Sequence, residues 1–126
     1  MDKQAFELTE KIVKIIDSKK GCDITALDVS AVTPMTDCFV LCSVGSSTQV
    51  NAIADAIDEK LSESGIEPHH IEGQRSGTWV LMDYGDVIVH VMFRDTREYY
   101  NIERLWRDAE MVDISKIIET EGEDRK

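Results

Sequence analysis

The stretch Cys38–Val50, CFVLCSVGSSTQV, decides the fold because it joins a buried strand directly to a capped helix. Its first seven residues form an almost continuous apolar run of strand length, which is typical of a strand covered on both faces of a sheet. Gly45 then supplies a turn, and Ser46 precedes Gln49 by three residues, which is the spacing of a helix capping box. We therefore expect a central strand, a tight turn and a helix that ends near Gly65.

The sequence before this stretch predicts one helix and one strand. Between residues 2 and 20, apolar side chains recur at steps of three and four residues, which indicates an amphipathic helix that ends at Gly21. Residues 22–30 alternate between apolar and polar side chains, as in a strand, and Thr33-Pro34 breaks the pattern.

The sequence after the capped helix predicts a hairpin and a last helix. Residues 78–83 and 87–93 are strand-like, and we expect Tyr84-Gly85 between them to be a two-residue turn. A short extended piece is expected at residues 69–73. A cap-like pair, Asp95 and Glu98, opens the last helix. Its apolar stripe consists of Tyr99, Ile102, Leu105, Trp106 and Ala109.

The order of these elements predicts the fold class. A helix, two strands, a helix, a hairpin and a helix form an α/β fold in which helices flank a mixed sheet. We expect residues 1–112 to form a single α/β domain and residues 113–126 to form an acidic tail that is partly frayed.

The charge of the chain limits its partners. The formal net charge of −11 repels a phosphate backbone and suits a basic protein surface, although acidity can also serve solubility alone. We therefore expect no direct sequence-specific contact with nucleic acid. No apolar run approaches the roughly 18 residues of a membrane span, and the first residues lack the pattern of a signal or transit peptide. We expect no membrane association and a cytoplasmic location.

The cysteines and histidines do not predict a metal site. The chain has three cysteines and no C-x-x-C pair, which argues against a disulfide framework in this protein. Cys38 and Cys42 share one face of a strand with about 13 Å between them, which is too far to bind one ion together with His69 and His70. We expect buried thiols and no bound metal.

The turn Gly45-Ser46-Ser47 resembles the glycine–serine opening of nucleotidyltransferases. That chemistry needs two or three carboxylates that gather divalent metal, and no acid pair on a strand follows this turn. A plain helix cap is the favoured interpretation, and we expect no cofactor.

The predicted hairpin has two unlike faces. With Tyr84-Gly85 as the turn, Asp83 lies opposite Asp86, which places two like charges side by side at some cost in stability. A three-residue loop would change these partners but would leave Trp79, Leu81 and Asp83 on one face. One face carries Val80, Met82, Val87, Val89 and Val91 and is core, whereas the other carries Trp79, Leu81, Asp83, Asp86, Ile88 and His90.

This second face allows several interpretations. His90 is more readily a structural histidine than a general base, because no nucleophile is placed to form a relay with it. Asp83 and Asp86 more readily serve turn geometry than acid catalysis. Aromatic side chains beside acids suit a protein-binding hot spot or an aromatic core stripe equally well.

Two motifs resemble the Iojap family of bacterial ribosomal silencing factors. They are WVLMDYGDVIVHV at residues 79–91 and REYYNIERLW at residues 97–106, and the resemblance spans about residues 6–112. It implies a nucleotidyltransferase-like fold without the catalytic acids, and a translation factor that is not an enzyme. Members bind the large ribosomal subunit through ribosomal protein L-fourteen, block joining of the small subunit when nutrients are scarce, and commonly form homodimers.

The resemblance also implies the binding residues. The matching positions are Trp79, Leu81, Asp83, Tyr84, Asp86, His90, Glu98 and Tyr99. Two other functions stay open at this point, namely a divergent nucleotidyltransferase-like enzyme and a generic dimeric protein-interaction module.

Overall fold

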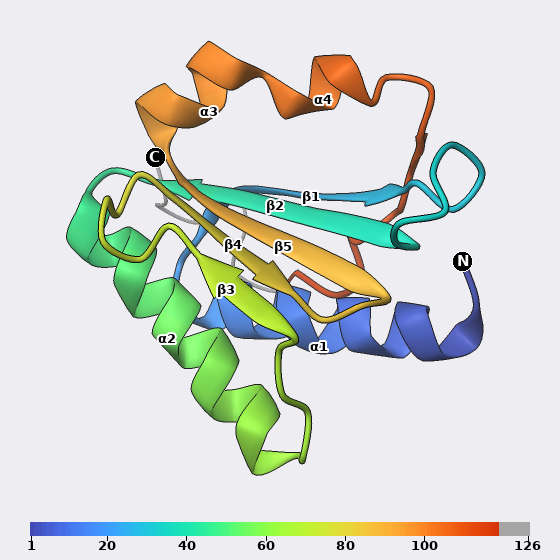
Figure 1. Ribbon diagram of the computed structural model, residues 1–126, viewed down its shortest axis with the longest axis horizontal. Helices are drawn as coiled ribbons and strands as arrows, with labels where there is room; N and C mark the ends of the chain where they lie inside the picture. Colours follow the sequence, from blue (N-terminus) through green and yellow to red (C-terminus); the bar gives the residue numbers. More distant parts are fainter. Residues whose placement is uncertain (119–126) are drawn as a thin grey trace.

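A six-stranded mixed sheet separates two layers of helices in the computed structural model, which describes residues 1–118 (Figure 1). Helices α1 and α2 cover one face of the sheet, and α3 and α4 lie over the other. The strand order is β3-β4-β5-β2-β1-β6. The expected α/β class with flanking helices is confirmed. The elements are α1 (Lys3–Ser18), β1 (Cys22–Asp28), β2 (Cys38–Val44), α2 (Ser47–Glu63), β3 (His70–Glu72), β4 (Trp79–Asp83), β5 (Val87–Phe93), α3 (Arg94–Tyr100), α4 (Ile102–Leu105) and β6 (Glu110–Met111).

The apolar strand β2 lies in the middle of the sheet, as its sequence predicted. It pairs antiparallel with β1 and parallel with β5, and all of its residues are buried. Helix α2 follows as expected, because the Ser46 hydroxyl oxygen accepts from the backbone N–H of Gln49 at 3.2 Å and caps the helix.

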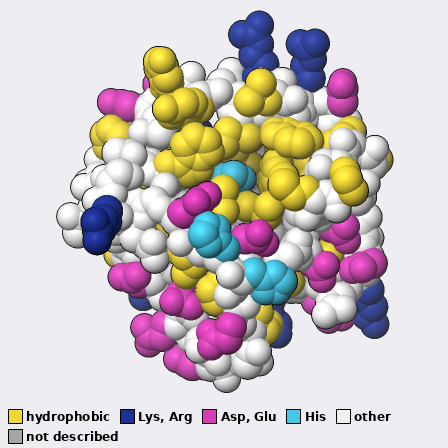
Figure 2. All heavy atoms as spheres, viewed as in Figure 1, with side chains coloured by type: hydrophobic (Ala, Val, Ile, Leu, Met, Phe, Trp, Pro, Cys, Tyr) yellow, Lys and Arg dark blue, Asp and Glu magenta, His cyan; other side chains and the backbone are white. Residues whose placement is uncertain are grey.

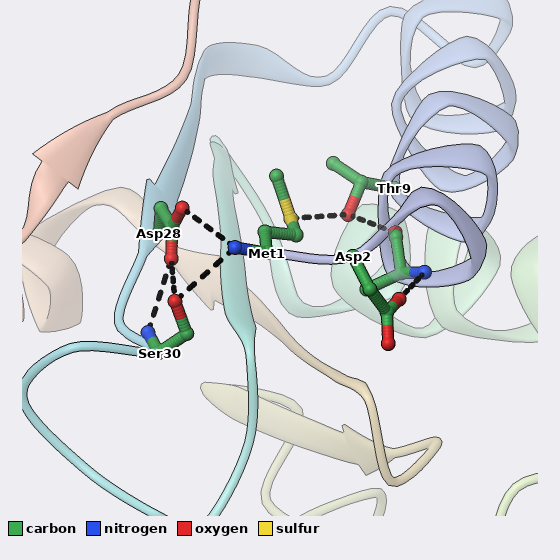
Figure 3. Close-up of polar contacts among 6 residues, drawn as sticks. Met1, Asp2, Thr9, Asp28 and Ser30 are labelled. Carbon is green, nitrogen blue, oxygen red and sulfur yellow. Dashed lines mark hydrogen bonds and ion pairs between the residues drawn. The ribbon is translucent and has the colours of Figure 1, made fainter.

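The start of α1 is tied to the end of β1 (Figure 3). The amine of Met1 donates to Oδ2 of Asp28 and to Oγ of Ser30, each at 3.3 Å. Asp2 caps the helix by accepting from the backbone N–H of Ala5 at 2.8 Å. Burial raises the pKa of Asp28, but hydrogen bonds from Ser30 and the amine outweigh burial, so this pKa lies below its ordinary value.

The hairpin of β4 and β5 differs from the predicted register. Tyr84 donates its backbone N–H to the carbonyl of Val87 at 2.9 Å, so the two-residue loop is Gly85-Asp86. The first residue of such a loop needs a positive φ, which Gly85 adopts at +85° and a tyrosine would adopt only with strain. The expected opposition of Asp83 and Asp86 is therefore wrong, and Asp83 pairs with Ile88.

Apart from Asp86, which lies in the loop, the two faces of the hairpin are nevertheless those predicted, because the register differs by two residues and the side-chain period is also two. The inward face packs in the core beneath α1 and α2, and the other face packs toward α3 and α4. The inward set is Val80, Met82, Val87, Val89 and Val91.

The last helix is broken, in contrast to the prediction. Asn101 adopts a left-handed conformation with φ of +48°, which asparagine tolerates better than most residues, and it divides α3 from α4. The expected apolar stripe is consequently interrupted. Ile102 is buried, whereas Tyr99 is 81% exposed and Leu105 is 77% exposed.

The packed chain continues beyond residue 112, where we expected the tail to begin. Val112 donates to the carbonyl of Ala26, and Ile114 and Ile117 are buried in the core beneath α1 and α2. The remainder of the expected tail, residues 119–126, lies outside the described residues. None of the helices in residues 1–118 combines the length and the apolarity that a membrane span needs.

Candidate protein-binding face

The sheet face beneath α3 and α4 carries an incompletely covered apolar surface. One row of neighbouring side chains crosses it from the edge strand inward, namely Glu72, Leu81, His90 and Leu41. We call the partly open end of this surface the Trp79 face, which consists of Trp79, Leu81, Asp83 and His90 of the hairpin, Glu72 of β3, and Tyr99 and Tyr100 of α3.

The Trp79 face is hollowed. Glu72, Gly73, Trp79 and Leu81 line a depression of about 400 Å³ beside the edge strand. Figure 2 shows hydrophobic side chains gathered below α3 and α4 around a hollow that contains a histidine, with acidic side chains along its lower border. A concave apolar surface with an acidic border is suited to a partner that brings apolar and basic groups together.

Aromatic rings connect the Trp79 face to the core. The ring of His90 meets Phe39 edge-on with centroids 5.2 Å apart, and lies 5.9 Å from the ring of Trp79. Trp79 in turn lies 5.1 Å from Tyr100, and Tyr100 lies 5.0 Å from Tyr99. The series therefore runs from a buried phenylalanine to a tyrosine that is almost fully exposed, which fixes the exposed rings in place.

The protonation state of His90 follows from its contacts. The indole N–H of Trp79 donates to Nδ1 of His90 at 3.0 Å, so Nδ1 is an acceptor and the neutral ring carries its proton on Nε2. Burial lowers the pKa of His90 to about 4. Nδ1 accepts from Trp79 and Nε2 carries the proton, so neither nitrogen has the free lone pair that a general base needs, and the geometry favours a structural histidine.

The turn residues Asp83, Tyr84 and Asp86 do not form one site. Asp83 accepts from the backbone N–H of Gly85 at 2.7 Å and so stabilises the turn. Tyr84 is only 6% exposed and belongs to the opposite core, and Asp86 lines a separate cavity beside Tyr84 and α1. We expected Tyr84 and Asp86 to lie with Trp79, and their placement on the other side is a correction to that expectation.

Glu98 and Tyr99 also separate. Tyr99 extends the Trp79 face, whereas Glu98 lines a cavity of about 620 Å³ beside the start of β1 and the end of β2, together with Arg94 and Arg97. Helix α3 thus contributes side chains to both places.

A residue that sequence analysis missed, Arg97, holds this part of the structure together. It is 9% exposed and donates to the carbonyl of Asp23 at 2.6 Å, to Oγ1 of Thr25 at 3.1 Å and to Glu103 at 2.9 Å. Burial raises the pKa of Glu103, but the hydrogen bond from Arg97 outweighs burial, so this pKa lies below its ordinary value. Arg97 therefore joins α3 and α4 to the end of β1.

The cysteines and the serine cap that were considered for metal or nucleotide chemistry have structural roles. Burial raises the pKa of Cys38 to about 11 and that of Cys42 to about 12, so both are protonated thiols in the core. Within residues 1–118, no three histidine, cysteine or acidic side chains are placed to share an ion. At the glycine–serine turn, Ser46 is occupied with capping α2.

Comparisons with known proteins point to one family. A family model described as "Ribosomal silencing factor during starvation" matches residues 2–126. A ribosomal silencing factor of Halalkalibacterium halodurans is 40% identical over 112 residues, which are 89% of this chain and 96% of that protein. A crystal structure of a Chromobacterium violaceum protein superposes with a TM-score of 0.79 at 39% identity, covering 85% of this chain and 88% of the other. The chloroplastic protein Iojap of Zea mays is 24% identical over 113 residues, 90% of this chain and 49% of that protein.

Proposed function

Because this chain belongs to the ribosomal silencing factor family, we propose that it binds the large ribosomal subunit and represses translation. In this proposal the Trp79 face contacts ribosomal protein L-fourteen, and the bound domain sterically blocks joining of the small subunit when nutrients are limited. The observation that carries the proposal is the apolar hollow of the Trp79 face, which has aromatic side chains around it and acids at its border.

The composition of this face supports a basic protein partner. Trp79 and Leu81 are half-buried and Tyr99 and Tyr100 are exposed, so they offer anchors that a partner can desolvate. Glu72, the half-exposed Asp83 and the net charge of −11 favour approach by a positively charged surface. The anchors would supply most of the affinity and the charges most of the orientation.

The proposed action needs no turnover and no cofactor. We propose a regulator that is not an enzyme, because neither ring nitrogen of His90 has a free lone pair and, within residues 1–118, no carboxylates gather after the glycine–serine turn. Steric inhibition requires only that the domain stay bound where the small subunit would dock.

We further propose that the protein acts in the cytoplasm and forms a homodimer. The exposed apolar side chains outside the hollow, such as Leu105 and Met111, offer surface for a second copy. Light scattering coupled to gel filtration measures the mass directly, and a monomer at all accessible concentrations would contradict the dimer.

Co-sedimentation with isolated ribosomal subunits tests the main proposal. The protein should sediment with large subunits and not with small ones. Trp79→Ala combined with Asp83→Lys should abolish this binding, because one change removes an anchor and the other reverses a charge at the border. Unchanged sedimentation of this double variant would show that the partner binds elsewhere.

A matched control uses residues away from the Trp79 face. Met35→Ala combined with Glu59→Lys removes one exposed apolar side chain and reverses one exposed charge, as the test variant does. It should sediment with large subunits as the unaltered protein does.

Two other outcomes would favour the alternatives. Equal binding to both subunits would indicate a generic dimeric interaction module. Heat released on titration with nucleotide and magnesium would indicate a nucleotidyltransferase-like activity instead, since that chemistry requires both ligands to bind.

A further inference from the structure

One polar group on the Trp79 face is buried without a hydrogen-bond partner. Nε2 of His90 has no acceptor among the atoms of residues 1–118, and the histidine is only 5% exposed. Because Trp79 donates to Nδ1, the neutral ring carries a hydrogen on Nε2, so the unpaired group is an N–H donor. Unpaired buried N–H groups are rare in native proteins and call for an explanation.

The position of this donor connects it with the proposed binding surface. His90 shares a cross-strand row with Leu81 and Leu41, so its side chain projects from the sheet face that α3 and α4 cover, and Nε2 is the ring nitrogen farther from the backbone. Leu81 is the strand neighbour of His90, and Trp79 is its hydrogen-bond partner. Both of these residues line the 400 Å³ depression.

We propose that the partner places a hydrogen-bond acceptor on the Nε2–H of His90 when it docks on the Trp79 face. The acceptor is a peptide carbonyl or hydroxyl oxygen of a protein segment whose apolar side chain fills the depression. This inference rests on the proposed function and specifies the chemistry of the partner at one point. Docking requires a rotamer change among the side chains that cover Nε2, and such changes are common at interfaces.

The charges around His90 select a neutral acceptor. Glu72 follows Leu81 in the same cross-strand row, and Asp83 belongs to the next residue pair on the same face. A carboxylate or a phosphate brought to His90 would lie near both acids, in a chain whose net charge is −11. A carbonyl or hydroxyl avoids this repulsion, and basic groups of the same segment can pair with the two acids.

Two substitutions test the hydrogen bonds of the two ring nitrogens of His90 one at a time. The side-chain amide of asparagine reaches about as far as Nδ1, so His90→Asn keeps an acceptor for Trp79 and loses the outer donor. The amide of glutamine reaches about as far as Nε2, so His90→Gln keeps an outer donor and loses the acceptor for Trp79. The pair therefore isolates the contact with the partner from the contact within the protein.

Binding of both variants to isolated large subunits is compared with that of the unaltered protein. We expect His90→Asn to bind roughly 10-fold more weakly and His90→Gln to stay within about 3-fold, since the loss of one hydrogen bond to a buried donor is worth about one order of magnitude in affinity. Equal binding by His90→Asn and the unaltered protein would overturn the inference. If the unaltered protein does not bind large subunits, the proposed function fails instead.

Thermal unfolding establishes that each variant is folded before binding is measured. If His90→Asn does not fold, cryo-electron microscopy of the unaltered protein on the large subunit decides the matter. An oxygen of the partner within about 3.2 Å of Nε2 supports the inference. A complex in which Nε2 faces only carbon atoms, or in which an acidic group occupies the position, overturns it.

Discussion

Trp79 and His90 are joined by a hydrogen bond of 3.0 Å between side chains that stand diagonally across two neighbouring strands. Trp79 pairs directly with Met92, and His90 pairs directly with Leu81, so the indole must lean along the sheet to reach Nδ1. This bond fixes the orientation of the half-buried tryptophan through a buried neighbour. It also determines which nitrogen of the histidine carries the proton.

Removing this bond should lower stability measurably. Trp79→Phe keeps an aromatic side chain but leaves Nδ1 of His90 without its donor, and we expect the free energy of unfolding to fall by about 1–2 kcal/mol. Urea unfolding followed by circular dichroism measures the change. Trp106→Phe is the control, since Trp106 packs on Phe39 with ring centroids 5.0 Å apart. Equal losses in the two variants would mean that the hydrogen bond contributes nothing.

The buried histidine should make stability depend on pH. Its pKa of about 4 in the folded state lies below the ordinary value of 6.5, so the unfolded chain binds the proton more readily. The stabilisation from the neutral ring is complete above pH 6.5 and is lost as the pH falls toward 4. At about 1.4 kcal/mol per pKa unit, the full effect is on the order of 3 kcal/mol.

Unfolding measured between pH 4.5 and 7 in the unaltered protein and in His90→Gln tests this dependence. The difference between their unfolding free energies should change across this range, because the variant lacks the titrating ring. Carboxylates with lowered pKa values, such as Asp28 and Glu103, contribute to both proteins alike. Parallel curves would contradict the assignment.

Arg97 should not tolerate replacement by lysine. Its guanidinium donates to β1 and to Glu103 at once, and an ammonium group cannot reach these acceptors with the same geometry. We expect Arg97→Lys to lose about 2–4 kcal/mol of stability, because Glu103 is left half-buried without its partner. Faster amide hydrogen exchange in α3 and α4 should accompany the loss. The exposed Arg94 is the control, and Arg94→Lys should leave both measurements nearly unchanged.

Two glycines with similar backbone angles should respond differently to alanine. Gly73 has φ of +93° and Gly65 has φ of +78°, so both substitutions strain the backbone. A Cβ at Gly73 would lie 1.9 Å from the carbonyl oxygen of Trp79, whereas a Cβ at Gly65 meets nothing within 4 Å. We expect Gly73→Ala to cost about 1–3 kcal/mol more than Gly65→Ala in urea unfolding. Similar costs would indicate that β4 can move away from Gly73 without loss.

The parts of the fold that depend on local signals were predictable from sequence. The strand, turn and helix around Ser46 follow from an apolar run and a capping pair only three residues apart. The faces of the hairpin were also predictable, because side chains alternate within each strand whatever the partner strand does. The exact partners were predicted wrongly because the loop was placed at Tyr84-Gly85. A two-residue loop favours glycine at its first position, and that preference points to Gly85-Asp86.

The unpredicted features depend on distant parts of the chain. Tyr84 follows Asp83 and lies two residues before Asp86, and these neighbours suggested an exposed position. Its ring nevertheless packs in the core beneath α1 and α2. Arg97 occupies a helix that sequence alone shows as largely polar, and its burial follows only when β1 and α4 close around it. The break at Asn101 arises from the same closure, because α4 must turn to bring Ile102 onto the sheet.

The parallel pairing of β2 with β5 also affects how the chain folds during synthesis. Cys38 pairs with Val87, 49 positions later, so β2 leaves the ribosome well before the strand that completes one of its edges. Its antiparallel neighbour β1 is already available and covers the other edge early. Until β5 emerges, CFVLCSV is an uncharged segment without proline or glycine and with one open edge, the kind of segment that joins other chains into aggregates. The strand that organises the native sheet is therefore also a part of the nascent chain that chaperones would protect.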